Sequence, residues 1–305
     1  MMIKLLRLLA ICSLAVLFVS TAWAQTYTTV HDPNDNAGVT ELIGGPNPQG
    51  TSVGTYLYYD ELSGVLYWHG FALSSQGVFI PIDYPGALYT QPGFISSNGF
   101  VTGNYRSPYL PWHGFVLHGG QYTTVDSDYP GAVATILAGI TPSGEIAGYS
   151  CLADIRCNVG PFKSFIISKK GVFTHFDPPG TDPNFGSTAS VINASGAIVG
   201  AYTGTDGFQH GYLLKNGRYT TVDYPGAANT FCGGMNDQGD IVGAYWNEDQ
   251  VVHSYLLSHG VFTSFDPPDS IGNYNSQATG INNAGIIIGL YQDAYYNVFG
   301  YIRTP

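Results

Sequence analysis

Aspartates beside Pro-Gly turns are the residues of this sequence that first suggest chemistry. Asp223 ends a Tyr-Thr-Thr-Val-Asp segment and precedes Tyr-Pro-Gly-Ala, and Asp126 and Asp83 stand in related segments. His210 lies 13 residues before Asp223, and a histidine lies 13 or 14 residues before each of the other two. A histidine paired with a carboxylate could supply acid–base catalysis. The same pairing could also hold two strands together, so the surrounding elements must decide between the two roles.

The chain is built from a unit that occurs six times. One motif of the unit, in its general form G-x-N-x-x-G-x-I-x-G-x-Y, begins at Gly44, Gly93, Gly139, Ser190, Gly233 and Thr279. A second motif, of the His-Gly-Phe type, begins at Trp68, Trp112, Phe162, Gln209, Val252 and Val298. A third motif, of the Tyr-Thr-Thr-Val-Asp type, begins at Tyr27, Phe79, Tyr122, Phe173, Tyr219 and Phe262.

Each unit predicts four short antiparallel strands. The first strand runs into the N-x-x-G turn, where the Asn side chain can bond its own backbone and Gly tolerates positive φ. The glycine within the second strand, such as Gly200, indicates a bulge or a close backbone approach. Four strands in about 45 residues, repeated six times, are typical of a β-propeller. We therefore expect an all-β, six-bladed β-propeller with four antiparallel strands per blade; a β-helix is the alternative.

The two ends of the repeat predict how the ring closes. Residues 27–31 form a strand of the fourth type, whereas residues 299–303 form a strand of the third type. An N-terminal strand that completes the last blade would remove the exposed sheet edges of an open stack. Residues 25–305 are expected to form this single propeller domain.

The third and fourth strands of a unit are predicted to form a tight hairpin. If histidine and aspartate face each other across it, the midpoint between them must fall at the turn. If His210 faces Asp223, the hairpin centres on the Asn216–Gly217 turn. The other pairs that centre on or beside a glycine are His69 with Asp83, His113 with Asp126, Lys163 with Asp177 and His253 with Asp266. Opposite charges across two strands stabilise their register by up to about 1 kcal/mol. Five equivalent pairs favour this structural role over catalysis, and Phe299 facing His31 takes the sixth position.

The motifs resemble a known family. The triplets His-Gly-Phe at His69 and His113, the triplet His-Gly-Tyr at His210 and the recurring D-x-P-G-A segment are similar to secreted bacterial proteins with extracellular repeats of the HAF type. That family is named for a His-Ala-Phe triplet, so this chain carries a variant of it. The resemblance covers nearly all of the chain after residue 24. It implies a secreted, propeller-like repeat protein and no particular activity.

The N-terminus and the charge balance indicate where the protein works. Lys4 and Arg7 flank a short apolar run that ends at Ala22–Trp23–Ala24, which is typical of a secretory signal peptide spanning residues 1–24. We expect the mature protein to be secreted or periplasmic, monomeric and without a membrane span. The chain has 10 Lys and Arg residues against 21 Asp and Glu residues, a net charge of −11. Such a surface repels nucleic acid and anionic membranes, so we exclude both as partners.

Three cysteines follow the leader segment. Cys151 and Cys157 bracket a five-residue segment and are expected to form a disulfide in an oxidising compartment. Cys232 is interpreted as a small buried apolar residue rather than a nucleophile.

Candidate binding residues lie in the long loops between the second and third strands. These loops share one face of a propeller with the fourth-to-first connections, and loops on a rigid scaffold commonly carry sites. Aromatic rings beside carboxylates suit a sugar, so we expect an extracellular glycan or protein ligand at Tyr58, Tyr59, Asp60, Tyr109, Trp112, Trp246, Glu248, Asp249 and Tyr295. The alternative interpretation is that these aromatic side chains only cover strand edges.

Signals for catalysis or a cofactor are weak. The sequence contains no G-x-S-x-G motif, no phosphate loop and no zinc-ligand spacing. The acidic segments 204–207 and 247–249 could hold Ca²⁺, but neither has the spacing of a known calcium loop. We therefore expect a non-enzymatic binding protein without a cofactor or resident metal. The alternatives are a carbohydrate-active enzyme, a hydrolase or lyase that uses Asp60 and Glu248, and a purely structural envelope protein.

Overall fold

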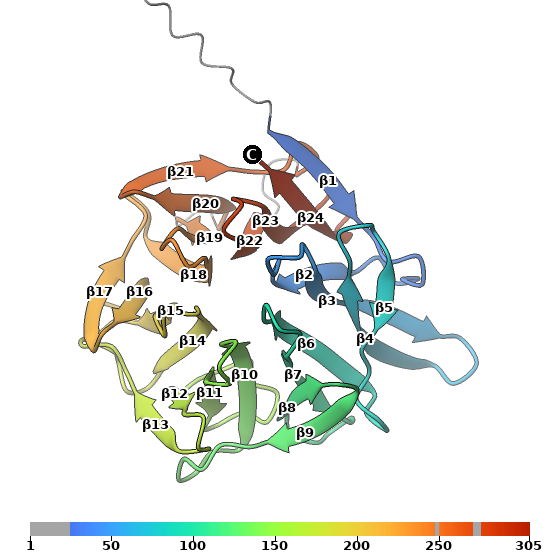
Figure 1. The fold of residues 1–305 in the computed structure, drawn as a ribbon, viewed down its shortest axis with the longest axis horizontal. Helices are drawn as coiled ribbons and strands as arrows, with labels where there is room; N and C mark the ends of the chain where they lie inside the picture. Colours follow the sequence, from blue (N-terminus) through green and yellow to red (C-terminus); the bar gives the residue numbers. More distant parts are fainter. Residues whose placement is uncertain (1–24, 248–249, 271–275) are drawn as a thin grey trace, which may run out of the picture.

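The protein is a ring of antiparallel β-sheets around a central axis (Figure 1). We analysed a computed structural model, which describes residues 25–247, 250–270 and 276–305. These described residues form 24 strands and contain no helix. The expectation of an all-β propeller is therefore confirmed.

The strands follow the six sequence units, and each unit runs from the axis toward the rim. The first two units contain β2 (Thr40–Gly44), β3 (Ser52–Asp60), β4 (Val65–Leu73), β5 (Phe79–Pro81), β6 (Tyr89–Ile95), β7 (Val101–Arg106), β8 (His113–His118) and β9 (Gln121–Val125). The next two contain β10 (Ala134–Ile140), β11 (Ile146–Cys151), β12 (Phe162–Ile167), β13 (Phe173–Phe176), β14 (Ser187–Ile192), β15 (Ile198–Thr203), β16 (Gln209–Lys215) and β17 (Arg218–Val222). The last two contain β18 (Asn229–Met235), β19 (Ile241–Trp246), β20 (Val252–Ser258), β21 (Val261–Phe265), β22 (Ser276–Ile281), β23 (Ile287–Gln292), β24 (Val298–Thr304) and β1 (Thr26–Val30).

The N-terminal strand completes the last unit, as the sequence predicted. β1 pairs antiparallel with β24, so that Thr26 lies opposite Thr304 and Val30 lies opposite Gly300. The order of this sheet is β1-β24-β23-β22. The two ends of the described chain are thus hydrogen-bonded to each other, and the ring is closed by backbone pairing.

The prediction of six separate four-stranded sheets is wrong. Four sheets have four strands each, whereas the other eight strands belong to one sheet. The link is a single parallel bridge between Trp68 on β4 and Tyr89 on β6, made by the Trp68 N–H donating to the Leu88 carbonyl at 3.2 Å. Isolated parallel bridges join the equivalent positions of two other neighbouring units, at Phe162 with Gly186 and at Val298 with Val39. The eight-stranded sheet therefore arises because the returning chain passes close to the start of the third strand.

The second-strand glycines place an aromatic ring in the core of every unit. Each glycine lies directly opposite an aromatic residue of the third strand, in the pairs Gly54–Phe71, Gly103–Phe115, Gly148–Phe165, Gly200–Tyr212, Gly243–Tyr255 and Gly289–Tyr301. The opposing first strand carries a register shift at the same level, between Cys232 and Gly234 in the fifth unit. All six rings are buried. The close backbone approach predicted for these glycines is confirmed, whereas the bulge lies in the opposing first strand and not at the glycine itself.

The N-x-x-G turns join the first and second strands of each unit and also connect neighbouring units. Asn236 Oδ1 accepts the N–H groups of Gln238 and Asp240, which fixes its own turn. Its Nδ2 donates to the carbonyl of Asn282 in the next unit at 3.2 Å, and Asn193 donates to the Asn236 carbonyl at the same distance. One asparagine therefore stabilises its turn and ties it to the neighbouring turn.

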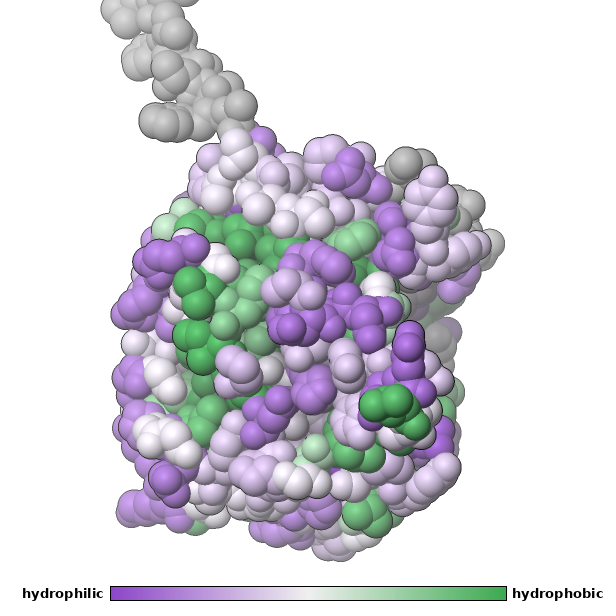
Figure 2. Space-filling view, turned by 90° about the vertical axis from the view of Figure 1, so that its right-hand side faces the viewer, coloured by the Kyte–Doolittle hydropathy of each residue, from purple (hydrophilic) through white to green (hydrophobic). Residues whose placement is uncertain are grey.

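The side of the ring that carries β3, β4 and β5 is mostly hydrophilic, with hydrophobic residues gathered between the polar ones (Figure 2). Exposed hydrophobic residues of these strands and of the turns between them include Leu62, Leu66, Val78 and Ile80. The β3–β4 hairpin extends outward from the ring (Figure 1).

The close approach at the second-strand glycine makes a stability prediction. A Cβ at Gly243 would lie 1.9 Å from the Phe231 carbonyl oxygen and 3.0 Å from a ring carbon of Tyr255. Because the nearer atom is backbone, we expect Gly243→Ala to lower the free energy of unfolding by about 2–3 kcal/mol in a denaturant titration. Gly226→Ala is the matched control, since Gly226 has φ of +80° but open space around its Cβ position, and should cost only about 1 kcal/mol. Equal losses in the two variants would contradict the packing explanation.

Candidate functional site

The predicted cross-strand pairs are in contact in the structure. Nδ1 of the histidine lies 2.7–3.0 Å from the carboxylate in the pairs His69–Asp83, His113–Asp126, His210–Asp223 and His253–Asp266. Lys163 contacts Asp177 in the third unit. In the sixth position, the rings of His31 and Phe299 pack edge to face with centroids 5.7 Å apart.

These pairs act on the strands rather than on a cavity. The second oxygen of Asp83 accepts the Gly70 N–H at 3.1 Å, so the carboxylate also binds the backbone of the third strand. His210 contacts Asp206 as well, at 3.0 Å. Burial opposes protonation of His210, but its hydrogen bonds to Asp223 and Asp206 raise its pKa above the ordinary value. The ten residues of the five pairs do not line the central pocket.

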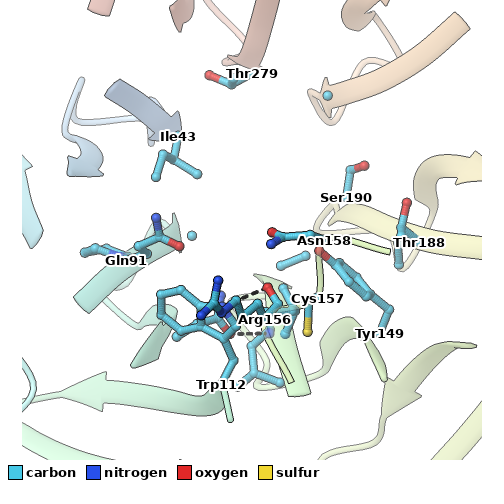
Figure 3. Close-up of a pocket in the computed structure, with 18 of the residues that line it drawn as sticks. Ile43, Gln91, Trp112, Tyr149, Arg156, Cys157, Asn158, Thr188, Ser190 and Thr279 are labelled. Carbon is cyan, nitrogen blue, oxygen red and sulfur yellow. Dashed lines mark hydrogen bonds between the residues drawn. The ribbon is translucent and has the colours of Figure 1, made fainter. Parts of the chain in front are cut away.

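The central pocket is where the inner strands of all six units meet, and its volume is about 580 Å³. Two levels of inner-strand residues surround it. One level consists of Gln91, Ile136, Thr188, Phe231 and Gln277, and the other consists of Ile43, Gly93, Ala138, Ser190, Gly233 and Thr279. Thr279, Ser190, Thr188 and Gln91 are arranged around the same opening in Figure 3.

Two long loops supply one wall of this pocket. Arg106 is the last residue of β7, and Trp112 lies in the β7–β8 loop that follows it. Arg156, Cys157 and Asn158 come from the β11–β12 loop (Figure 3). The Arg106 guanidinium carbon lies 4.5 Å from the ring centroid of Tyr89 and 4.8 Å from that of Trp112. Burial lowers the pKa of Arg106, although the guanidinium stays charged in the physiological range.

The β11–β12 loop is held rigidly. Cys151 and Cys157 form the predicted disulfide, with Cα atoms 5.5 Å apart. The carboxylate of Asp154 accepts the N–H groups of Arg156 and Asn158 at 2.9 and 3.0 Å. These backbone hydrogen bonds lower the pKa of Asp154. The loop therefore presents Arg156 and Asn158 to the pocket in a defined conformation.

Trp112 fastens this loop to the neighbouring unit. Its indole Nε1–H donates to the Arg156 carbonyl at 3.1 Å, and its backbone N–H donates to the Ile155 carbonyl at 3.2 Å. The residue is only 8% exposed and packs with Ala134 and Cys151. Trp112 lines the pocket as predicted, but its buried ring positions Arg106 and the loop instead of offering an open stacking face.

The other predicted binding residues lie away from the pocket. Tyr58, Tyr59 and Asp60 belong to β3, where Tyr58 pairs with Tyr67 and Asp60 with Val65 in the outward hairpin. Asp60 accepts hydrogen bonds from Leu62 and Ser63, and the bond from Ser63 lowers its pKa. Asp60 does not line the central pocket, because β3 and β4 continue to pair beyond the ring.

Three further candidates are also separate from the pocket lining. Tyr109 and Tyr295 are 83% and 84% exposed at loop tips. Trp246 ends β19, opposite Val252 and Asn229. Glu248 and Asp249 lie outside the described residues. Among the described members of the predicted set, Trp112 alone lines the central pocket.

Sequence reasoning missed the two arginines. The sequence prediction included aromatic and acidic side chains of the long loops, but neither Arg106 nor Arg156. A signal was present, since the chain has only 10 Lys and Arg residues and two of them lie in adjacent long loops. The described residues that line the pocket include no Asp or Glu.

Glu41 occupies an inner-strand position equivalent to Gln91 and Gln277. Each of these three residues directly precedes the residue that pairs with the second-strand glycine. Burial raises the pKa of the Glu41 carboxyl to about 7. The carboxyl is therefore partly protonated at neutral pH, which reduces negative charge next to the axis.

Several other features of the described residues bear on function. Cys232 is buried, and its thiol forms a hydrogen bond with the Tyr255 hydroxyl. Burial raises the pKa of the thiol to about 12, which agrees with a packing role. In the parts of the chain that the structure describes, no cluster of three His, Cys, Asp or Glu side chains suits a metal ion. The same residues contain no helix long and apolar enough to cross a membrane.

Known structures share the fold at low sequence identity. The putative TolB from Agrobacterium tumefaciens matches with a TM-score of 0.53 and 14% identity over 79% of this chain and 86% of that chain. A triple arginine-to-alanine mutant of AofleA from Arthrobotrys oligospora gives a TM-score of 0.53 and 11% identity over 91% and 86%. The β-propeller domain of the Trilobed protease from Pyrococcus furiosus gives 0.51 and 10% over 86% and 93%. These similarities show the propeller fold alone. A scan against protein-family models finds no match, and neither does a search of the curated proteins.

The raised pKa of Glu41 predicts a pH-dependent stability. The neutral carboxyl contributes stability that is fully present below its ordinary value of 4.5 and is lost as the pH rises through about 7. We expect Glu41→Gln to unfold with a free energy about 2–3 kcal/mol above that of the wild type at pH 8, since one pKa unit corresponds to about 1.4 kcal/mol. At pH 4 the two proteins should differ little in denaturant titrations. Glu61→Gln, at an exposed position, is the control and should change neither value.

Proposed function

We propose that the protein is a secreted, non-enzymatic β-propeller that binds an extracellular ligand, a glycan or a protein, on its long-loop face. Counted by repeat units, the ring has six blades, because β2–β5 and β6–β9 are joined through one parallel bridge only. The leader-like residues 1–24, the disulfide and the HAF-type motifs support an extracellular or periplasmic location.

The central pocket is the observation that carries the binding proposal. Its volume of about 580 Å³ falls within the range of about 300–1,000 Å³ typical of small-ligand sites. Two long loops of neighbouring units reach it, and one of them is closed by the Cys151–Cys157 disulfide. Hydroxyl and amide groups from Thr188, Ser190 and Gln277 offer hydrogen bonds to sugar hydroxyls.

The catalytic alternative, a carbohydrate-active enzyme, needs two carboxyl groups on either side of a glycosidic bond. Asp60 lies at the end of the outward hairpin, so it does not support this alternative. The structural-envelope alternative predicts no ligand. The proposed binding protein would hold a ligand in the central pocket without converting it. An enzyme would convert the ligand, and a structural envelope protein would bind none.

Filling the pocket tests the proposal. Ser190 lines the opening (Figure 3), and Ser190→Trp would occupy part of it while leaving both arginines in place. We expect the wild-type protein to bind members of a glycan and peptide panel, and Ser190→Trp to weaken that binding at least tenfold in calorimetry. Gln76→Trp, at an exposed outer turn, is the matched control and should bind like the wild type.

Three outcomes would contradict the proposal. Equal binding by wild type and Ser190→Trp would place the ligand elsewhere on the molecule. Release of products from a bound saccharide would favour an enzyme. No binding to any member of the panel would favour the structural role.

A further inference from the structure

Arg106 is a cation held at the pocket without a salt bridge among the described residues. Its guanidinium lies over the rings of Tyr89 and Trp112, at 4.5 and 4.8 Å. Its Nε is buried and has no hydrogen-bond partner among the described residues. Removing a charged donor from water without a partner is costly, so such groups commonly mark a site completed by a ligand.

Arg156 adds a second positive charge to the same wall. Burial is the main cause that lowers the pKa of Arg106, and the charge of Arg156 lowers it further, whereas Tyr89 and Asp154 act in the opposite direction. Within the described part of the chain, neither arginine forms a salt bridge. Asp154 is nearby, but its two oxygens accept backbone N–H groups of its own loop. Two guanidinium groups therefore stand against one nearby carboxylate, and the pocket wall keeps a net positive charge.

The rest of the lining suits a polyhydroxylated ligand. The inner strands present amide and hydroxyl groups, including Gln91, Thr188, Gln277 and Thr279. No carboxylate is present among the described lining residues. This positive pocket lies in a chain whose net charge is −11, so its sign is opposite to that of the protein as a whole.

Resting on the proposed binding function, we propose that the central pocket binds an acidic saccharide, with the carboxylate of a uronate sugar facing Arg106 and Arg156. The planar guanidinium fork matches a carboxylate through two parallel hydrogen bonds. The neutral polar groups of the inner strands then contact the sugar hydroxyls. Tyr89 and Trp112 orient Arg106, and the Cys151–Cys157 disulfide fixes the loop that carries Arg156.

The test compares two saccharides that differ only in charge. An oligogalacturonate carries the carboxylates, and its methyl ester has the same rings without them. Wild-type protein should bind the acid at least tenfold more tightly than the ester in calorimetry. Binding of the acid should weaken as the salt concentration rises, because added ions screen the attraction.

Variants assign this preference to the arginines. Arg106→Met keeps the apolar stem against the two aromatic rings and removes the charge, and it should erase the preference for the acid while the weaker binding of the ester persists. Arg156→Gln should reduce the preference in part. Arg218→Gln, on the exposed outer strand β17, is the control and should bind like the wild type. Denaturant midpoints close to the wild-type value will show that the variants are folded.

Failure of this inference can be distinguished from failure of the proposed function. Equal affinity for acid and ester, or an unchanged preference in folded Arg106→Met, overturns the carboxylate assignment but leaves a binding pocket. The carboxylate assignment also fails if the protein binds a neutral glycan, a sulfated glycan or a peptide, but not the oligogalacturonate. If Ser190→Trp weakens that binding, the binding pocket itself remains supported. If Ser190→Trp weakens the binding of no ligand, both the acidic-saccharide inference and the proposed binding function are overturned.

Discussion

The close approach of three strands at the second-strand glycine is the constraint on which the ring depends. In each unit the glycine faces a buried aromatic ring of the third strand, while a first-strand carbonyl lies on its other side. A Cβ at Gly54, for example, would lie 2.1 Å from the Glu41 carbonyl and 2.7 Å from the Phe71 ring. Any side chain would push the first strand away from the second. The absence of a side chain lets the aromatic ring pack between neighbouring units, as Tyr255 does against Val199 and Val222.

This constraint also decides which residues reach the axis. The register shift of the first strand sits beside the glycine, and the residues around it, such as Gln91 and Gly93, line the pocket. Those positions differ in side chain from unit to unit, from Phe231 to Thr188. The repeated residues build the scaffold, whereas the chemistry of the axis comes from positions that do not repeat.

The features that the sequence predicted are those that depend on local spacing. The glycine turn between His210 and Asp223 sets their hairpin register, and the short interval between Cys151 and Cys157 permits their disulfide. The site depends instead on where whole loops go once the ring has closed. Tyr58 was predicted to lie in a long loop, but its pairing with Tyr67 continues β3 and β4 outward. The sequence around Arg106 does not indicate that its guanidinium group packs against the ring of Tyr89, which belongs to a different strand.

Trp112 is almost fully buried, yet it positions the residues that give the central pocket its charge. Its ring packs under Arg106, its Nε1–H holds the Arg156 carbonyl, and its own carbonyl accepts the Thr135 N–H at 3.0 Å. One buried side chain thus sets the position of both arginine-bearing loops relative to the inner strand of the third unit. Orientation of this kind, completed before a ligand arrives, reduces the entropy lost on binding. The outer pairs such as His210 with Asp223 stabilise hairpins at the rim, whereas the two arginines line the pocket at the axis.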